Sequence, residues 1–290
     1  MSADIESLAV HRRAIDATIP LLGAIQSIAE MAYRDAERAG APVRAYATRV
    51  HGMLNVLVTL LEPAERQQLL TRMAGLSPGA VVAIGSERGL CGAFNDRLVR
   101  HMAGLLQPET LVVCWGSRVA RLLRTSGYRV ALSAPLPSLV VPLYADVERM
   151  TLDLLDLVDQ RRLGRLVAVF NAPLHGFQYA ATVRSILPPA IETPAARRVE
   201  LDIKPASDIP NLFVHLVTEY VLTELYSAVI QSAVSEQLAR VAAMRLAGEN
   251  ARKLLDDLTM QYNLARQHAV TQSLLEIVTG YQTTIAEADR

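Results

Sequence analysis

The stretch that decides the fold lies near the C-terminus, where residues 250–280 read NARKLLDDLTMQYNLARQHAVTQSLLEIVTG. It belongs to a proline-free segment from Asn211 to Arg290, in which only Gly248 and Gly280 interrupt residues that favour helix. At about 1.5 Å per residue, such a helix would reach on the order of 100 Å. No compact domain buries a rod of that length, so we expect a projecting helix that a second element must hold.

The N-terminal residues 1–62 carry the only other long helical pattern, with apolar residues at helical spacing. We expect a kink or break near Pro42 and a lesser disturbance or a late helix start near Pro20, because proline removes a backbone donor. Many apolar-stripe positions of residues 208–290 are alanine, which lets a partner helix approach closely. Asp208 is expected to cap this helix, with Pro210 in its first turn. The two terminal helices are therefore predicted to form a long antiparallel coiled coil.

Residues 78–207 have a different pattern of apolar residues, which predicts an inserted Rossmann-like α/β domain. Short, fully apolar runs typical of strands buried on both faces alternate with helical patterns. The expected strands are 80–84, 111–115 and 166–170, the expected helices are 95–106, 117–125 and 144–161, and the expected edge strands are 180–187 and 198–202. The fold class is thus α/β: a coiled coil of the terminal helices with an α/β domain inserted between them.

Composition excludes several classes of function. Lys and Arg number 29, as do Asp and Glu, so the formal net charge is zero. This balance argues against nucleic acid as a dominant partner, since phosphate contacts need clustered cations. The N-terminus lacks a secretory pattern, and no uninterrupted apolar run reaches the roughly 18 residues of a spanning helix. We expect a soluble protein or one peripheral to a membrane.

A glycine-rich turn, Gly85-Ser86-Glu87-Arg88-Gly89-Leu90-Cys91-Gly92, follows the first expected strand and precedes a helix. Such turns can cradle phosphate, but this spacing is not GxGxxG and lacks the Lys-Ser/Thr of a P-loop. A tight structural turn is favoured, and nucleotide binding is the alternative. The six histidines and two cysteines show no metal-type spacing and no nucleophile with a companion base, so we expect no catalytic residue, cofactor or metal.

A polar cluster interrupts the terminal helix at Arg266, Gln267, Thr271 and Gln272. One interpretation is a solvated helix face, because 267 and 271 lie four residues apart and 266 sits beside them. The other is a set of hydrogen-bonding groups that grip a partner subunit. The residue chemistry alone supports both equally.

Two motifs resemble the γ subunit of the F-type ATP synthase. The turn from Ile84 to Asn95 is similar to the family's S-D/E-R-G-L-C-G-x-x-N pattern, and residues 256–280 resemble its C-terminal motif. Ser235-Glu236 with Arg240 and Ala242-Ala243-Met244 resemble a third segment. The resemblance covers essentially the whole chain. Ser273 stands where the family usually has Glu, and residues 25–32 lack the family's lysines, which indicates a divergent branch, with the N-type ATPases as a candidate.

The resemblance implies the central rotor stalk of an F1Fo-type ATP synthase or ATPase, which couples ion flow to ATP synthesis or hydrolysis but is not an enzyme by itself. It implies α- and β-type ring subunits, an ε-type subunit and a membrane c-ring as partners, and a peripheral location on the cytoplasmic face of the bacterial inner membrane. It assigns Arg266, Gln267, Thr271 and Gln272 to partner-subunit contact. The rivals are a small-molecule- or nucleotide-binding enzyme using the Gly85–Gly92 turn, and a free-standing helical adaptor.

Overall fold

The computed structural model describes residues 2–60, 79–107, 109–136, 141–161, 163–175, 178–190 and 209–288. The chain forms two compact units, one made of Met1–Ile28 with Ala242–Arg290 and the other of Ala29–Val241. Helices α1 (Ser2–Leu60) and α6 (Ile209–Ala288) each contribute to both units. The expected strand at 198–202 and the expected cap at Asp208 lie outside the described residues.

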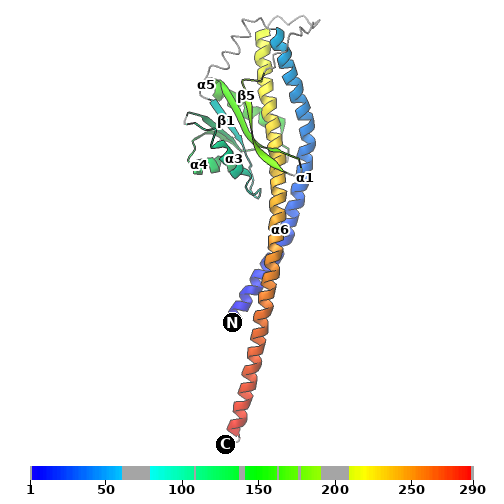
Figure 1. Cartoon of the computed structure of the whole chain (residues 1–290), viewed down its shortest axis with the longest axis vertical. Helices are drawn as coiled ribbons and strands as arrows, with labels where there is room; N and C mark the ends of the chain where they lie inside the picture. Colours follow the sequence, from blue (N-terminus) through cyan, green and yellow to red (C-terminus); the bar gives the residue numbers. More distant parts are fainter. Residues whose placement is uncertain are drawn as a thin grey trace. The chain divides into compact units, whose positions relative to one another are not determined.

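The larger unit, Ala29–Val241, is built on a five-stranded sheet with the order β3-β2-β1-β4-β5. Its strands are β1 (Gly79–Ile84), β2 (Leu111–Trp115), β3 (Val130–Ala134), β4 (Arg165–Pro173) and β5 (Tyr179–Leu187). The first four pair in parallel, and β5 turns back antiparallel to β4. The central strand β1 is apolar throughout because both of its faces are covered. Figure 1 shows this sheet beside the upper segment of α6.

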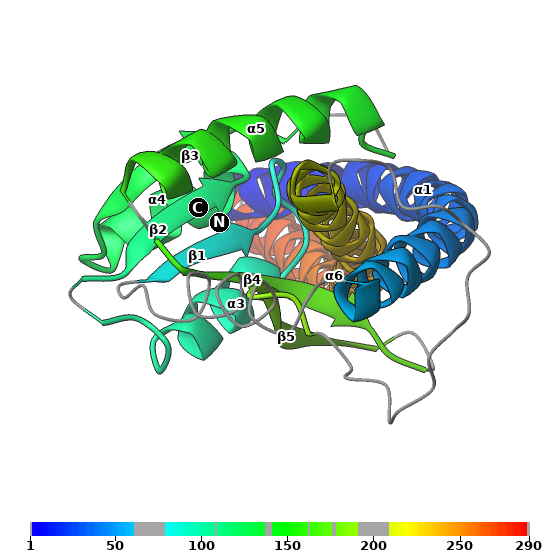
Figure 2. The same cartoon turned by 90° about the horizontal axis from the view of Figure 1, so that it is seen from above.

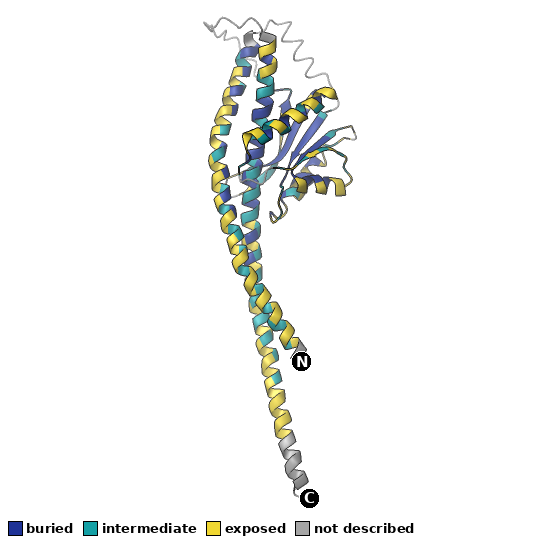
Figure 3. Cartoon of the chain, turned by 180° about the vertical axis from the view of Figure 1, so that it is seen from behind, coloured by how far each residue is buried: buried dark blue, intermediate teal, exposed yellow. Residues whose placement is uncertain are grey.

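Helices cover both faces of the sheet. On one face, α3 (Phe94–Met102) and α4 (Ser117–Thr125) pack Leu98 and Leu123 against the strands. On the other, α5 (Tyr144–Gln160) packs together with the segments of α1 and α6 that belong to this unit. Figure 2 shows α5 and α3 on opposite sides, and Figure 3 shows the strands as the buried centre. This arrangement is the doubly wound α/β fold expected from the sequence.

Within this unit α1 and α6 run antiparallel. The Tyr46 hydroxyl donates a hydrogen bond of 2.9 Å to Glu219, while Gly40, earlier in α1, lies beside Ile230, later in α6. The two helices are in contact here, since a Cβ on Gly40 would lie at an ordinary van der Waals distance of 3.5 Å from Ile230 Cγ2. The predicted antiparallel pairing of the terminal helices and the inserted α/β domain are therefore confirmed.

The smaller unit pairs the N-terminal segment of α1 with the C-terminal segment of α6. The Arg12 guanidinium lies 4.7 Å from the centre of the Tyr262 ring, a cation–π contact across the two helices. The apolar stripe of α6 is half-buried here at Leu255, Leu258 and Tyr262. From Val270 to Thr279 every residue is exposed, and this part of α6 is drawn as yellow ribbon in Figure 3.

Two expectations need correction. The break near Pro42 is wrong, because α1 runs unbroken from Ser2 to Leu60. Pro20 and Pro42 are both exposed, so water can solvate the carbonyl that each proline leaves without a donor. Strand β3 was not expected, because its sequence VALSA is short and mixes β-branched and small residues.

The segment Asn211–Thr279 contains a window that is long and apolar enough to cross a membrane by composition, with a mean hydropathy of 1.2. In the structure 56% of that window is buried. A helix that packs its apolar residues inside a protein core passes the same test.

Candidate functional site

The polar cluster predicted from the sequence lies on the exposed face of α6 in the smaller unit. The side chains of Arg266, Gln267, Thr271 and Gln272 are all exposed. The neighbouring stripe residues Tyr262 and Ala265 are half-buried. By helical geometry Gln267 and Thr271 lie on the side of α6 away from this stripe, whereas Arg266 and Gln272 flank it. The geometry makes the four side chains available for contact with another molecule.

The structure brings three of these four residues together. Arg266, Gln267 and Thr271 line one shallow surface depression with Asn263 and Val270. Gln272 does not line it, and donates a 3.1 Å hydrogen bond to Glu276 on the following turn. The grouping follows from helical geometry, because residues 263, 267 and 271 stack at i, i+4 spacing.

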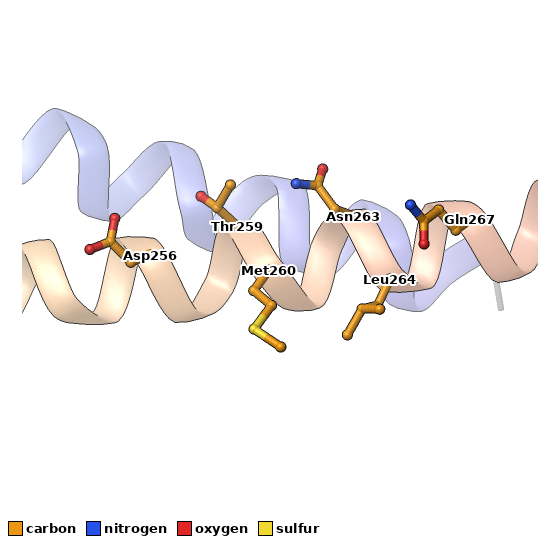
Figure 4. Close-up of a pocket in the computed structure, with 6 residues that line it drawn as sticks. All are labelled: Asp256, Thr259, Met260, Asn263, Leu264 and Gln267. Atoms are coloured by element: carbon orange, nitrogen blue, oxygen red, sulfur yellow. The ribbon is translucent and has the colours of Figure 1, made fainter.

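Gln267 also borders a second depression, which the sequence analysis did not single out. Its lining is Asp256, Thr259, Met260, Asn263, Leu264 and Gln267. Figure 4 shows Met260 and Leu264 projecting from one side of the helix, while Thr259 and Asn263 project from another. Met260 is 65% exposed and Leu264 is 47% exposed. Exposed apolar residues outside the coiled-coil stripe were the available signal, since they have no role in pairing with α1.

The glycine-rich turn after β1 packs tightly against its own domain. A Cβ on Gly85 would lie 2.4 Å from Val119 Cβ and 2.8 Å from Asn95 Oδ1. Gly116, at the start of α4, has a φ of +113°, and a Cβ there would lie 2.8 Å from the Gly85 carbonyl oxygen. Both glycines therefore allow the close approach of α4 to the turn.

The polar groups of the turn bond to one another. The buried Ser86 amide donates to Asn95 Oδ1 at 3.0 Å, and Asn95 Nδ2 donates to Ser86 Oγ at 2.8 Å. Glu87 accepts hydrogen bonds from the amide and hydroxyl of Ser117, at 2.9 and 2.6 Å, and from the Leu136 amide at 3.1 Å. The first amide of α4 is thus capped by a carboxylate of the chain itself. This supports the structural interpretation of the turn over a phosphate cradle.

Replacing Glu87 by glutamine is expected to lower the free energy of unfolding by about 1 to 2 kcal/mol, because a charge-assisted cap becomes a weaker neutral one. The loss should appear in urea unfolding followed by far-UV circular dichroism. Glu109 is a suitable control, since it is exposed and its carboxylate accepts no hydrogen bond from any described residue. An equal effect of Glu109→Gln would contradict the capping role.

Side chains of α6 donate hydrogen bonds to the same turn within the larger unit. Ser232 Oγ donates to the Ile84 carbonyl at 3.2 Å. Arg240 donates to the Gly89 carbonyl at 3.2 Å and to Glu236 at 2.5 Å. Both charged side chains are largely buried, with 11% and 15% of Arg240 and Glu236 exposed. Burial raises the pKa of Glu236 above its ordinary 4.5, and Arg240 opposes that rise. We call Glu236, Arg240 and the Gly89 carbonyl the polar lock.

The two cysteines are buried thiols. Burial raises the pKa of Cys114 to about 12 and also raises that of Cys91. A thiol that stays protonated at neutral pH is a poor nucleophile. Within the part of the chain that the structure describes, no group of three His, Cys, Asp or Glu side chains is placed to hold a metal ion.

Comparisons with known proteins agree on one family. The family model described as "ATP synthase" matches residues 6–283. An ATP synthase gamma chain of Methylacidiphilum infernorum is 30% identical over 92% of this chain and 94% of that protein. An ATP synthase gamma chain of Chlorobium luteolum is 27% identical over 95% of this chain and 97% of that protein. Among solved structures, a chain in the rotor of Euglena gracilis mitochondrial ATP synthase has a TM-score of 0.68 at 15% identity, covering 93% of this chain and 100% of that chain.

Proposed function

Because the chain belongs to the ATP synthase gamma chain family, we propose that it is the central rotor stalk of an F1-type ATP synthase or ATPase. It couples ion flow to ATP synthesis or hydrolysis by rotating inside a catalytic ring. The observation that carries this proposal is the family match over residues 6–283, which includes both terminal helices and the inserted α/β domain. The gamma chain is a non-catalytic subunit, so the role of this chain is mechanical.

The partners follow from the family. The similar structures are of a rotor and of an F1 and c-ring assembly from Euglena gracilis, and of a central stalk and c-ring from Tetrahymena thermophila. By analogy the paired helices meet α- and β-type ring subunits, and the α/β domain meets an ε-type subunit and the c-ring. The protein is then peripheral to a membrane, on the cytoplasmic face of the bacterial inner membrane.

The mechanism rests on a helix that differs around its circumference. One side of α6 presents the apolar Met260 and Leu264, and another presents the polar Asn263 and Arg266. A catalytic site that meets the polar side experiences other contacts than one that meets the apolar side. Each site is then biased toward a different conformation, and rotation passes that bias from site to site.

Replacing Arg266 and Gln267 together by alanine is expected to lower coupled turnover of the assembled complex several-fold. Both side chains are exposed, so the free energy of unfolding should change by less than about 0.5 kcal/mol per site. ATP-driven ion pumping in reconstituted vesicles measures the loss. His268→Ala, an exposed change on the same turn, serves as the control. Wild-type pumping by the double variant would refute the contact assignment.

Co-purification tests the rotor role itself. A tagged copy expressed in its own host should bring down ring subunits in fixed ratio, and the purified chain alone should hydrolyse no ATP. A tagged chain recovered as a lone monomer would favour the adaptor interpretation. Calorimetric binding of a nucleotide or dinucleotide to the lone chain at sub-millimolar concentration would favour the enzyme interpretation.

A further inference from the structure

An arginine-rich edge of the α/β domain has no part in the rotor function described so far. From Thr110 to Ala145 the sequence contains four arginines and no Asp or Glu, in a chain whose formal net charge is zero. The four are Arg118, Arg121, Arg124 and Arg129, and all are exposed. Three lie on α4, and the fourth immediately precedes β3. None of the ion pairs found among the described residues uses them.

Strand β3 beside these arginines is one of the two edge strands of the described sheet, the other being β5. It pairs with β2 only, and no described strand lies on its other side. The Ala134 carbonyl faces β2, because it accepts a 2.9 Å hydrogen bond from the Gly116 amide. Backbone groups of successive strand residues alternate in direction, so those of Ser133 point to the open side. An open edge of this kind is a template for an added strand.

The two faces flanking this edge differ in chemistry. On the α4 side, a surface depression is lined by Ser117, Arg121, Arg124, Thr125, Ser133 and Pro135, together with Ala120 and Ala134. Arg124 donates to Ser133 Oγ at 2.9 Å, which places its guanidinium over the strand. On the α5 side, Leu132 and Leu136 are half-buried apolar residues packed on the core. A strand added here would meet positive charge on one face and apolar surface on the other.

We propose that the β3 edge with Arg121 and Arg124 is a docking site for an extended, acidic polypeptide segment that adds to the sheet as a sixth strand. Side chains of a strand alternate between faces, so the segment has an acidic residue at every second position and apolar residues between them. A bare phosphate group is the weaker candidate, because the Ser117 amide at the start of α4 is already bonded to Glu87. Main-chain pairing along the edge is specific to polypeptide, which disfavours nucleic acid and lipid.

The test uses the full chain and a fluorescein-labelled peptide of eight residues that alternates glutamate and valine. Fluorescence anisotropy should report binding that weakens as salt is raised. Arg121→Glu combined with Arg124→Glu should weaken it at least tenfold, whereas Arg149→Glu, an exposed change on α5, should leave it within twofold. A peptide of the same composition with its glutamates in one block should bind at least tenfold more weakly.

Backbone pairing has its own readout. Peptide binding should slow hydrogen exchange at the amide of Ser133, which points to the open side of β3. Ser133→Pro removes the outward amide and should abolish binding, whereas Ser133→Ala removes only the hydroxyl and should retain it. Three results would each overturn the proposal. The first is that the peptide does not bind, which would mean that the arginines prevent edge pairing. The second is that inorganic phosphate competes with the peptide equally well. The third is that the peptide binds but hydrogen exchange in β3 does not change.

Discussion

Gly85→Ala should destabilise the α/β domain by about 3 kcal/mol or more, although it adds a single methyl group. The new Cβ would lie 2.4 Å from Val119 Cβ and 2.6 Å from Val119 Cγ1. Neither atom is the mobile end of a long side chain, because Val119 is fully buried and β-branched on α4. Relief requires α4 to move away from β1, which would open the packing of that face.

Trp115 provides the local measurement. It is the only tryptophan of the chain, it is fully buried, and its carbonyl accepts the Gly85 amide at 2.9 Å. Urea unfolding followed by its fluorescence should show the midpoint of Gly85→Ala shifted strongly toward lower urea. Gly104→Ala is the matched control, because a Cβ there meets no atom within 4 Å and should cost less than about 0.5 kcal/mol. Equal shifts for the two variants would show that Gly85 is not a packing constraint.

Several strands and helices of this architecture could be predicted from the sequence, because their burial dictates which residues they contain. Strands buried on both faces must be apolar throughout, so β1, β2 and β4 appear as short unbroken runs. The helix α4 was predicted at its observed bounds, 117–125, because its apolar residues recur at helical spacing between polar ones. The edge strand β3 has no such signal, since one half-buried side and one exposed side leave only five weakly patterned residues.

The candidate site was less predictable. Exposed polar residues on a helix have the same sequence pattern whether they contact a partner or only water, so the assignment of Arg266 and Gln267 depended on resemblance. The break predicted near Pro42 was wrong, because propensity says nothing about which way a residue faces. The glycine-rich turn was favoured as structural from its spacing, but its hydrogen bonds to Asn95, Ser117 and Arg240 depend on tertiary contacts that no local pattern encodes.

The polar lock has a functional consequence if the chain is a rotor. Torque that enters through the α/β domain must reach α6 without slippage between them. Arg240 bonds at once to a backbone carbonyl of the turn and to Glu236 and Gln237 on its own helix. A guanidinium presents its donors in a fixed planar fork, so it resists displacement better than a single hydrogen bond would.

Arg240→Met should lower the free energy of unfolding by about 3 kcal/mol at neutral pH, because it leaves the Glu236 carboxylate buried without its partner and the Gly89 carbonyl without this donor. Arg245→Met is the matched control on the same helix. Its ion pair with Glu249 is 3.7 Å long and exposed, so that loss should lie near zero. Adding Glu236→Gln to Arg240→Met should recover a large part of the stability, since the uncompensated charge is gone.

The pH dependence distinguishes this account from a simple loss of packing. Burial raises the pKa of Glu236, so the folded state binds its proton more tightly than the unfolded chain does. That group therefore favours folding most below its ordinary pKa of 4.5, and its contribution is lost as pH rises through the folded-state value.

Removing Arg240 takes away the charge that lowers this pKa, so the cost of Arg240→Met should be larger at pH 8 than at pH 5. Urea unfolding at both values measures the difference, and Glu236→Gln should abolish it. A cost that is the same at both pH values would mean that Arg240 stabilises the domain by packing alone.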